Sequence, residues 1–336
     1  MNNFGKTMKS KLLSWEMLLV VVLVLEIIIF GQINPRFLRI NVLMGSINDF
    51  ISICVISLFV TFVMITGGID IQAGSIIGLT SITVGMLWQD KGLNIWVAAI
   101  FAIVVGLLCG LLSGFFVAYT GVQPMVVTLG GSFLYSGLAL AVVNMSSSEA
   151  YEGIGGFPES FMKLSSGNVA GIPNQLIIFI ALIIISYILL HKTKYGRYVF
   201  LCGVNPSASE YSGIRVKPII MSTYGLSGMS ASIAGLILTS YLGSAKSDLG
   251  ATYTLPIITA VVLGGTSNTG GKGGVIGTAI AAVVIGILKF GLNMSGMPSQ
   301  YLDIPVGILL IVVLTFRMTS SNPAVVAKFK KLTGKK

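Results

Sequence analysis

An acidic residue within an apolar stretch is the side chain in this sequence best placed to do chemistry. Asp70 follows Gly67 and Gly68 in ITGGIDIQAGS, so two glycines and an acid interrupt an otherwise apolar run. If the chain lies in a membrane, a helix broken there exposes backbone groups that protein or water must satisfy. The Asp70 carboxylate suits either of two roles: accepting backbone N–H bonds at the start of the next helix, or lining a polar path. Gly67, Gly68 and Asp70 therefore form a candidate helix break and path-lining site.

Two further ionisable side chains, Glu26 and Lys289, fall within apolar segments. Lys289 is near enough to the end of its segment for the ammonium group to reach lipid headgroups. These groups and Asp70 are too scattered to form the relay that a proton-coupled carrier needs. We therefore expect structural roles for Glu26 and Lys289, and an energy source outside this chain.

The patterns that signal catalysis, metal binding or ATP binding are not present in the sequence. His191 is the one histidine, which argues against a histidine-based metal site, and no serine stands in G-x-S-x-G. The stretch TSNTGGK, which ends at Lys272, has a superficial likeness to a phosphate-binding loop. Thr266 stands where that loop has its first glycine, and Gly273 where it has the Mg²⁺-binding serine or threonine. We predict no catalytic residue, no metal site and no cofactor, and a tight turn over residues 264–274.

Composition places the chain in the membrane. Apolar residues make up 54% of its 336 residues and charged residues only 10%, against about 25% in a soluble protein. The net charge of +10 is better explained by positive loops on the inner membrane face than by nucleic acid. We expect contact with membrane lipid and no nucleic-acid partner. Cys54, Cys109 and Cys202 fall in or beside apolar segments and imply no disulfide framework.

About 20 apolar residues are needed for a helix to cross about 30 Å of hydrocarbon. On that criterion the sequence predicts an all-α polytopic protein with about ten spans, over residues 15–32, 43–66, 70–88, 94–119, 123–145, 173–191, 218–242, 253–265, 274–294 and 301–317. The eighth is short, so we expect it to be broken or re-entrant. The distribution of lysine and arginine places the N- and C-termini in the cytoplasm.

A single transmembrane domain, residues 1–336, accounts for the whole chain. Its non-membrane parts are a cytoplasmic loop, a large external loop and a cytoplasmic basic tail, over residues 191–217, 146–172 and 318–336. Small residues recur at four-residue spacing in the fourth and ninth predicted spans: Gly106, Gly110 and Gly114, and Gly273, Gly277 and Ala281. This spacing predicts faces where helices approach closely.

A short helix is predicted inside the 191–217 loop. Asn205 can cap it, Pro206 suits its first turn, and Gly213 can end it. Glu210 and Tyr211 offer a charge and an aromatic anchor to a cleft in another protein. The predicted coupling helix consists of Asn205, Pro206, Ser207, Ala208, Ser209, Glu210, Tyr211, Ser212, Gly213 and Ile214. The alternative is an ordinary inner loop.

Four stretches of the sequence carry a family resemblance. They are GGIDIQAGSIIGL from Gly67, QPMVVTLGGSFLYSGLAL from Gln123, GVNPSASEYSGI from Gly203 and TAVVLGGTSNTGGKGGVIGTAIAAVVIGILKFGL from Thr259. In order and spacing they resemble the permeases of sugar-type ABC importers, the family that includes ribose permeases. The resemblance covers nearly the whole chain and implies a type II-like importer permease architecture.

Within that family, three shorter stretches resemble the D-type permeases of autoinducer-2 importers. They are YEGIGGFP from Tyr151, LHKTKYGRYVFL from Leu190 and GSAKSDLGA from Gly243. The sequence departs from the family pattern in two places, with Gln72 where serine is frequent and Lys272 where arginine is common. The first departure leaves the detail of the path near Asp70 open.

The resemblance implies a non-catalytic subunit of a bacterial inner-membrane importer. Its partners would be cytoplasmic ATPase subunits that bind the ATP, a second, related permease subunit and an external substrate-binding protein. The implied substrate is autoinducer-2, a furanose-like derivative of dihydroxypentanedione; ribose or another monosaccharide is the alternative. A secondary transporter working alone and a membrane enzyme are the rival classes, and the scarcity of buried ionisable and catalytic groups speaks against both.

Overall fold

The computed structural model describes residues 15–146 and 153–321, and within them the chain is mostly helical. Seven helices of this described part are long and apolar enough to cross a membrane. They are α2 (Trp15–Ile33), α3 (Ile40–Ile65), α5 (Ile95–Phe115) with its π-helical continuation η2 (Phe116–Thr120), α6 (Pro124–Asn144), α8 (Asn174–His191), α11 (Val216–Leu242) and α13 (Val275–Met294). The prediction of an all-α membrane protein is confirmed at this level.

Three apolar helices are shorter: α4 (Ala73–Gln89), α12 (Thr254–Leu263) and the part of α14 (Asp303–Ser321) that lies within the apolar stretch Ser299–Val313. At 1.5 Å per residue, the ten residues of α12 extend about 15 Å, half the thickness of a bilayer's hydrocarbon core. α4 begins at Ala73 and not at residue 70, because residues 66–72 leave the helical path. The helical path is therefore interrupted twice, before α4 and before α12.

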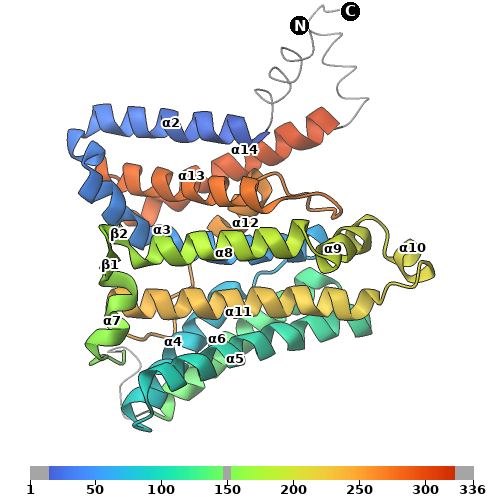
Figure 1. Cartoon of the computed structure of the whole chain (residues 1–336), viewed down its shortest axis with the longest axis horizontal. Helices are drawn as coiled ribbons and strands as arrows, with labels where there is room; N and C mark the ends of the chain where they lie inside the picture. Colours follow the sequence, from blue (N-terminus) through green and yellow to red (C-terminus); the bar gives the residue numbers. More distant parts are fainter. Residues whose placement is uncertain (1–14, 147–152, 322–336) are drawn as a thin grey trace, which may run out of the picture.

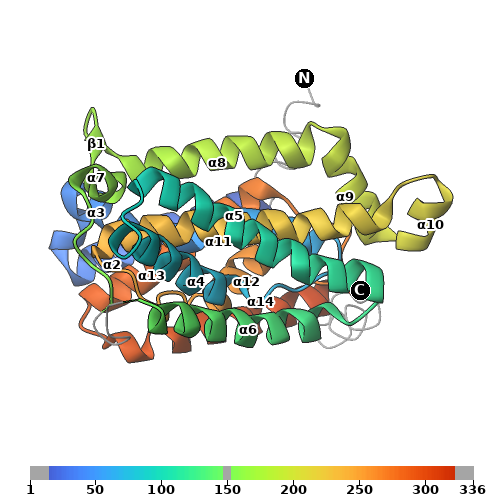
Figure 2. The same cartoon turned by 90° about the horizontal axis from the view of Figure 1, so that it is seen from below.

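The long helices run side by side along one axis of the molecule (Figure 1). α3 and α11 are mostly buried, whereas α2, α6 and α8 bury less than a third of their residues. α8 lies along one side of the bundle and α6 along the opposite side (Figure 2). The exposed side chains of these outer helices are largely leucine, isoleucine, valine and phenylalanine, which suits lipid or a partner helix.

Short elements cover the two ends of the bundle. The end at the left of Figure 1 carries η1 (Pro35–Leu38), α7 (Glu159–Ser166), the antiparallel pair β1 (Asn168–Val169) and β2 (Ile172–Pro173), and η3 (Ser299–Tyr301). The end at the right carries α9 (Lys194–Val204) and α10 (Pro206–Tyr211). Of the predicted external loop 146–172, residues 147–152 lie outside the described residues, and α7 packs Phe161 into the core. Of the predicted tail 318–336, residues 318–321 continue α14 and the rest lies outside the described residues.

Glycines bring α5 and α11 into backbone contact. A Cβ atom on Gly110 would overlap the carbonyl oxygen of Tyr224, and one on Gly114 would lie 2.6 Å from that of Met221. The predicted close-approach face of the fourth span is therefore confirmed. The prediction for the ninth span is wrong in part, because α13 begins at Val275 and Gly273 lies in the preceding turn.

Candidate functional site

The break between α3 and α4 is built from the residues that the sequence singled out. Gly67 has a φ of +82°, a left-handed conformation that favours glycine. Gly68 has no space for a side chain, since a Cβ atom there would overlap the Tyr224 hydroxyl oxygen. The two glycines let the chain leave α3 and turn back into the bundle next to α11.

Asp70 is buried, with 1% of its surface exposed, at the centre of this break. Its Oδ2 accepts a hydrogen bond from the Ser227 hydroxyl of α11 at 2.6 Å. Its Oδ1 accepts one from the Gln72 backbone N–H at 3.1 Å. The carboxyl group therefore ties the break to α11, and both of its oxygens have partners.

The capping prediction for Asp70 is corrected by this geometry. The N-cap residue of α4 is Gln72, whose side chain makes no cap hydrogen bond. Asp70 accepts only the N–H of the cap residue and none from within α4, so it holds the turn that leads into the helix. The gap of two residues between acceptor and donor is typical of an aspartate turn.

Side chains from other helices satisfy two backbone carbonyls of the break. Thr128 of α6 donates to the Ile69 carbonyl at 3.0 Å, and Thr254 at the start of α12 donates to the Ile71 carbonyl at 3.2 Å. Irregular backbone at membrane depth needs such partners, because lipid offers none. The break is thus held by α6, α11 and α12 together.

Gln72 extends the polar network toward α5 and α6. Its Oε1 accepts a hydrogen bond from the Ser113 hydroxyl at 2.6 Å, and Ser113 lies 3.0 Å from the Tyr135 hydroxyl. Tyr135 donates in turn to the Cys109 carbonyl at 2.7 Å. Gln72, which stands where serine is frequent in the family, is therefore part of a hydrogen-bond network with α5 and α6. No pattern in the sequence indicated this network.

The second interrupted segment, residues 243–253, runs along α4. Ala245 pairs with Ile154, the Lys246 backbone N–H donates to the Ser81 hydroxyl at 3.2 Å, and Gly250 lies against Gly74 without room for a Cβ atom on either. The segment then turns into α12. This non-helical segment thus runs beside α4, from one end of the bundle toward the Asp70 break.

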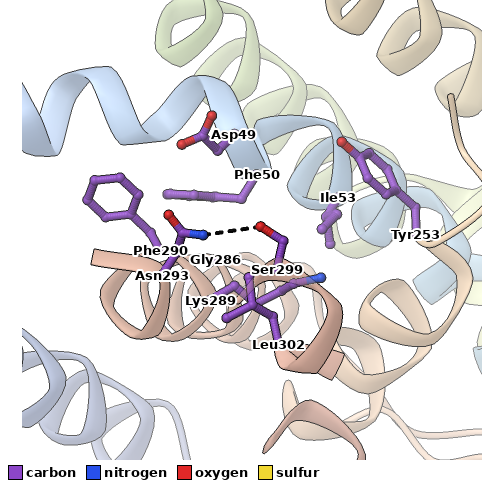
Figure 3. Close-up of a pocket in the computed structure, with 10 residues that line it drawn as sticks. All are labelled: Asp49, Phe50, Ile53, Tyr253, Gly286, Lys289, Phe290, Asn293, Ser299 and Leu302. Carbon is purple, nitrogen blue, oxygen red and sulfur yellow. Dashed lines mark hydrogen bonds between the residues drawn. The ribbon is translucent and has the colours of Figure 1, made fainter. Parts of the chain in front are cut away.

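Two cavities flank this segment. One, of about 170 Å³, is lined by Gly74, Ser75, Ser136, Leu140, Ser247, Asp248 and Ala251. The other, of about 290 Å³, lies between α3, α13, η3 and Tyr253 at the end of the segment and is shown in Figure 3. In it Asn293 donates to the Ser299 hydroxyl at 3.3 Å, beside Lys289 and the ring of Phe50.

The charged residues of the apolar segments have different surroundings. Lys289 forms an ion pair with Asp303, with 2.9 Å between Nζ and Oδ1. Glu26 is 9% exposed on α2, and its Oε2 has no hydrogen-bond partner within the described part of the chain. Among the described residues no hydrogen bond joins Glu26 to Asp70 or to its partners.

The 191–217 segment has one helix more than predicted. α9 begins after Thr193, whose hydroxyl accepts the Gly196 backbone N–H at 3.2 Å, and it buries Val199 and Cys202. The threonine cap before an apolar-periodic stretch is the sequence signal that could have identified it.

α10 follows α9 and has the predicted local features. The Asn205 side chain accepts the Ala208 backbone N–H at 3.0 Å, Pro206 is in the first turn, and Gly213 has a φ of +80°. Tyr211 is 94% exposed, whereas Ser209 is buried. α10 projects beyond the bundle, as both views show (Figures 1 and 2).

The end of α9 lies against the helix break. A Cβ atom on Gly203 would overlap the carbonyl oxygen of Ile65, the last residue of α3. The Gly271 backbone N–H donates to the same carbonyl at 2.8 Å, so the predicted 264–274 turn also packs there. α9, the turn and the start of the break thus share a single contact point at Ile65.

Within residues 15–146 and 153–321 no group of three or more histidine, cysteine or acidic side chains is placed to hold a metal ion. The sites that the structure does bring together are the Asp70 break, the 243–253 segment and the α9–α10 pair. The break is connected to the segment through α4 and to the α9–α10 pair through Ile65.

Comparison with known proteins identifies relatives of this chain. Residues 42–314 match the family described as the permease component of branched-chain amino acid transport systems. The chain is 44% identical over 317 residues to the "Autoinducer 2 import system permease protein LsrD" of Enterobacter sp. (strain 638), covering 94% of this chain and 97% of that protein. It is 45% identical over 306 residues to the proteins of that name from Escherichia coli (strain K12) and Shigella flexneri, covering 91% of this chain and 92% of each relative. No solved structure matches.

Proposed function

This chain belongs to that family of transport-system permease components, and from this premise we propose that it forms half of the translocation pathway of a bacterial importer for autoinducer-2. The importer is of the ATP-binding cassette type, and the chain is its non-enzymatic, multi-pass inner-membrane subunit. The assignment of autoinducer-2 as the substrate rests on the identity of 44–45%, over 91–94% of this chain, to permeases named for autoinducer-2 import.

Uptake in living cells tests this proposal. Cells that lack their own corresponding permease subunit would receive this chain together with its partner subunits, and uptake of labelled autoinducer-2, ribose and leucine would be measured. We expect uptake of autoinducer-2 only. Uptake of ribose instead would support the second candidate, a monosaccharide permease, and uptake of leucine alone would contradict both.

The energy source is proposed to be a pair of ATPase subunits that bind ATP outside this chain. Support comes from the scattered positions of Glu26, Asp70 and Lys289, which share no hydrogen bond in the described structure. Concentrative uptake by the purified chain alone in liposomes without ATP would show it to be a secondary transporter.

The topology is proposed to comprise ten membrane passages with both chain ends in the cytoplasm. The order of the described helices supports it, because successive helices alternate between the end that carries α7 and the end that carries α9 and α10 (Figure 1). The latter end also holds the basic residues Lys192, Lys194 and Arg197, as expected for the cytoplasmic side.

α10 is proposed to be the helix that the ATPase subunits grip. It projects from the bundle, it is stiffened by the Asn205 cap and Pro206, and Tyr211 offers an unburied aromatic ring to a cleft. Glu210 stands next to this ring. The ten residues from Asn205 to Ile214 would thus act as one rigid piece.

Movement of α10 has a direct route to the Asp70 break. α10 follows α9 with only Asn205 between them, and Gly203 of α9 packs on the Ile65 carbonyl at the start of the break. A shift of α9 therefore displaces Gly67 and Gly68, and through Asp70 it reaches Ser227 on α11. Packed elements of this kind transmit motion as discrete shifts, because their interfaces do not deform continuously.

Two further partners complete the proposal. A second, related permease subunit would cover the exposed side of α6, where Phe133 is 72% exposed. An external substrate-binding protein would dock at the end that carries α7. Membrane lipid would surround the remaining outer helices.

A further inference from the structure

The smaller cavity lies where α4, α6 and the 243–253 segment meet, close to the break. It is lined by four polar side chains and three small or apolar residues. The polar ones are Ser75, Ser136, Ser247 and Asp248, and the others are Gly74, Ala251 and Leu140. It faces the exposed side of α6. This is the side on which the second permease subunit is proposed to pack.

Three serine hydroxyls form a chain between α4 and α6 at this cavity. Ser136 donates to the Ser75 hydroxyl at 3.0 Å, and Ser75 lies 3.1 Å from the Ser132 hydroxyl. A hydroxyl is both donor and acceptor and can rotate, so this chain can exchange its internal bonds for bonds to a ligand. Lipid chains offer no such bonds, which makes Ser136, exposed on α6, poorly suited to a lipid-facing position.

The charge of the residues that line the cavity further limits the class of ligand that can bind. Asp248 is its one ionisable residue, and among the described residues that line the cavity none is lysine, arginine or histidine. A carboxylate without a neighbouring cation repels anions. A phosphorylated sugar, or the carboxylate of an amino acid, would find no positively charged partner there.

We propose that this cavity is a transient binding site for an uncharged, polyhydroxylated molecule of monosaccharide size, and that it excludes anionic and amino-acid ligands. The proposal rests on the proposed function, since it places the ligand on the pathway of the importer. The volume of about 170 Å³ suits such a molecule, as it is several times the roughly 30 Å³ that a water molecule occupies in the liquid. A hydroxyl of the ligand replaces the bond between the lining residues Ser136 and Ser75, and Asp248 accepts a hydrogen bond from another.

Thiol labelling tests whether the cavity is an aqueous binding site. Ser136→Cys would be introduced into the complete importer and treated with a water-soluble, membrane-impermeant thiol reagent. The background labelling comes from the native cysteines Cys54, Cys109 and Cys202, which are buried. The matched control is Ile184→Cys on α8, which is 53% exposed on the opposite side of the bundle, where lipid prevents thiolate formation (Figure 2).

We expect the Ser136→Cys importer to react at least tenfold faster than the Ile184→Cys importer. Autoinducer-2 should slow that reaction, and ribose 5-phosphate and leucine should not. If both variants react equally slowly, the cavity is not an aqueous binding site. If ribose 5-phosphate or leucine protects Ser136→Cys, the proposed class of ligand is wrong.

Uptake kinetics give a second, independent measurement. Ser136→Ala should raise the apparent KM for autoinducer-2 by about three- to tenfold, the change expected for loss of one uncharged hydrogen bond, and leave the maximal rate unchanged. Asp248→Asn should let ribose 5-phosphate compete measurably with uptake, whereas ribose 5-phosphate should not compete in the unmodified importer. The control Ser186→Ala removes a hydroxyl that bonds only within α8 and should change neither quantity.

The two levels of the proposal fail in different ways. If the unmodified importer does not take up autoinducer-2, the proposed function is wrong. If the unmodified importer takes it up but Ser136→Ala leaves KM unchanged and the labelled cysteine is not protected, the pathway exists and this cavity is not its binding site.

Discussion

The Asp70 carboxylate and the Ser227 hydroxyl are joined by a hydrogen bond of 2.6 Å across 157 residues of sequence. The bond links the break after α3 to the middle of α11, the helix that packs most extensively on α5. Because Asp70 is buried, a change at either partner leaves a polar group without water or protein to satisfy it.

Replacement of Asp70 should separate its hydrogen-bonding role from its charge. Asp70→Ala leaves the Ser227 hydroxyl and the Gln72 N–H without their acceptor, at a cost of about 1–3 kcal/mol each, so thermal stability and uptake should both fall. Asp70→Asn keeps one acceptor oxygen and should retain most of the stability. Thermal unfolding of the detergent-purified importer measures the difference, and an unaltered Asp70→Ala protein would refute the structural role.

Gly68 and Tyr224 form a second testable pair. Gly68→Ala places a methyl group on the Tyr224 hydroxyl oxygen, and overpacking of this kind costs about 1–3 kcal/mol. Tyr224→Phe removes that oxygen, which has no hydrogen-bond partner among the described residues, so the double variant should recover part of the lost stability. A double variant no more stable than Gly68→Ala would show that the clash lies elsewhere.

Gly203→Ala should uncouple the α9–α10 pair from the break. The added methyl group displaces α9 from the Ile65 carbonyl, while the exposed surface of α10 is unchanged. We expect the ATPase subunits to co-purify normally and ATP-driven uptake to fall at least tenfold. Gly45→Ala on α3, where a Cβ atom meets nothing within 4 Å, is the control and should behave as the unmodified protein.

Replacement of Glu210 and Tyr211 together by alanine should weaken ATPase association by at least tenfold, because the exposed ring and its neighbouring charge are removed from α10. Membrane insertion should be unaffected. Co-purification of the ATPase subunits measures the effect, and Tyr301→Ala, which removes a 52% exposed ring at the opposite end of the bundle, is the control. Normal association and normal uptake in the double variant would exclude α10 as the gripped helix.

Lys289 and Asp303 should contribute to stability as a pair. Lys289→Met leaves Asp303 without its partner and should lower the thermal unfolding temperature, whereas Lys289→Met with Asp303→Leu should restore much of it, because the unpaired charge is gone. Since the Lys289 side chain is 20% exposed and that of Asp303 44%, we expect an effect of about 1 kcal/mol. Loss of uptake by the double variant at unchanged stability would assign the pair a transport role.

The sequence alone determined the class of the protein and the approximate positions of its long helices and of the break, but it missed α9 and placed the start of α4 at residue 70 instead of Ala73. Periodic apolar segments, the two glycines before Asp70 and the Asn205–Pro206 cap act locally, over a few residues, so their effect on the backbone can be read without a fold. For the same reason α9 could have been predicted from its threonine cap. The hydrogen bond between Asp70 and Ser227 could not be predicted from the sequence, because α11 is distant in sequence whereas the cap role considered for Asp70 is local.

Only the tertiary structure decided which of these local features meet. Asp70 reaches Ser227 on α11, Gly203 of α9 reaches Ile65 of α3, and Ser136 of α6 reaches Ser75 of α4, so each contact joins two different elements of the bundle. Such contacts depend on the crossing of helices far apart in the chain, and spacing within one helix carries no information about the partner. The sequence therefore indicated a break and a projecting helix, and the packing of the bundle connected them.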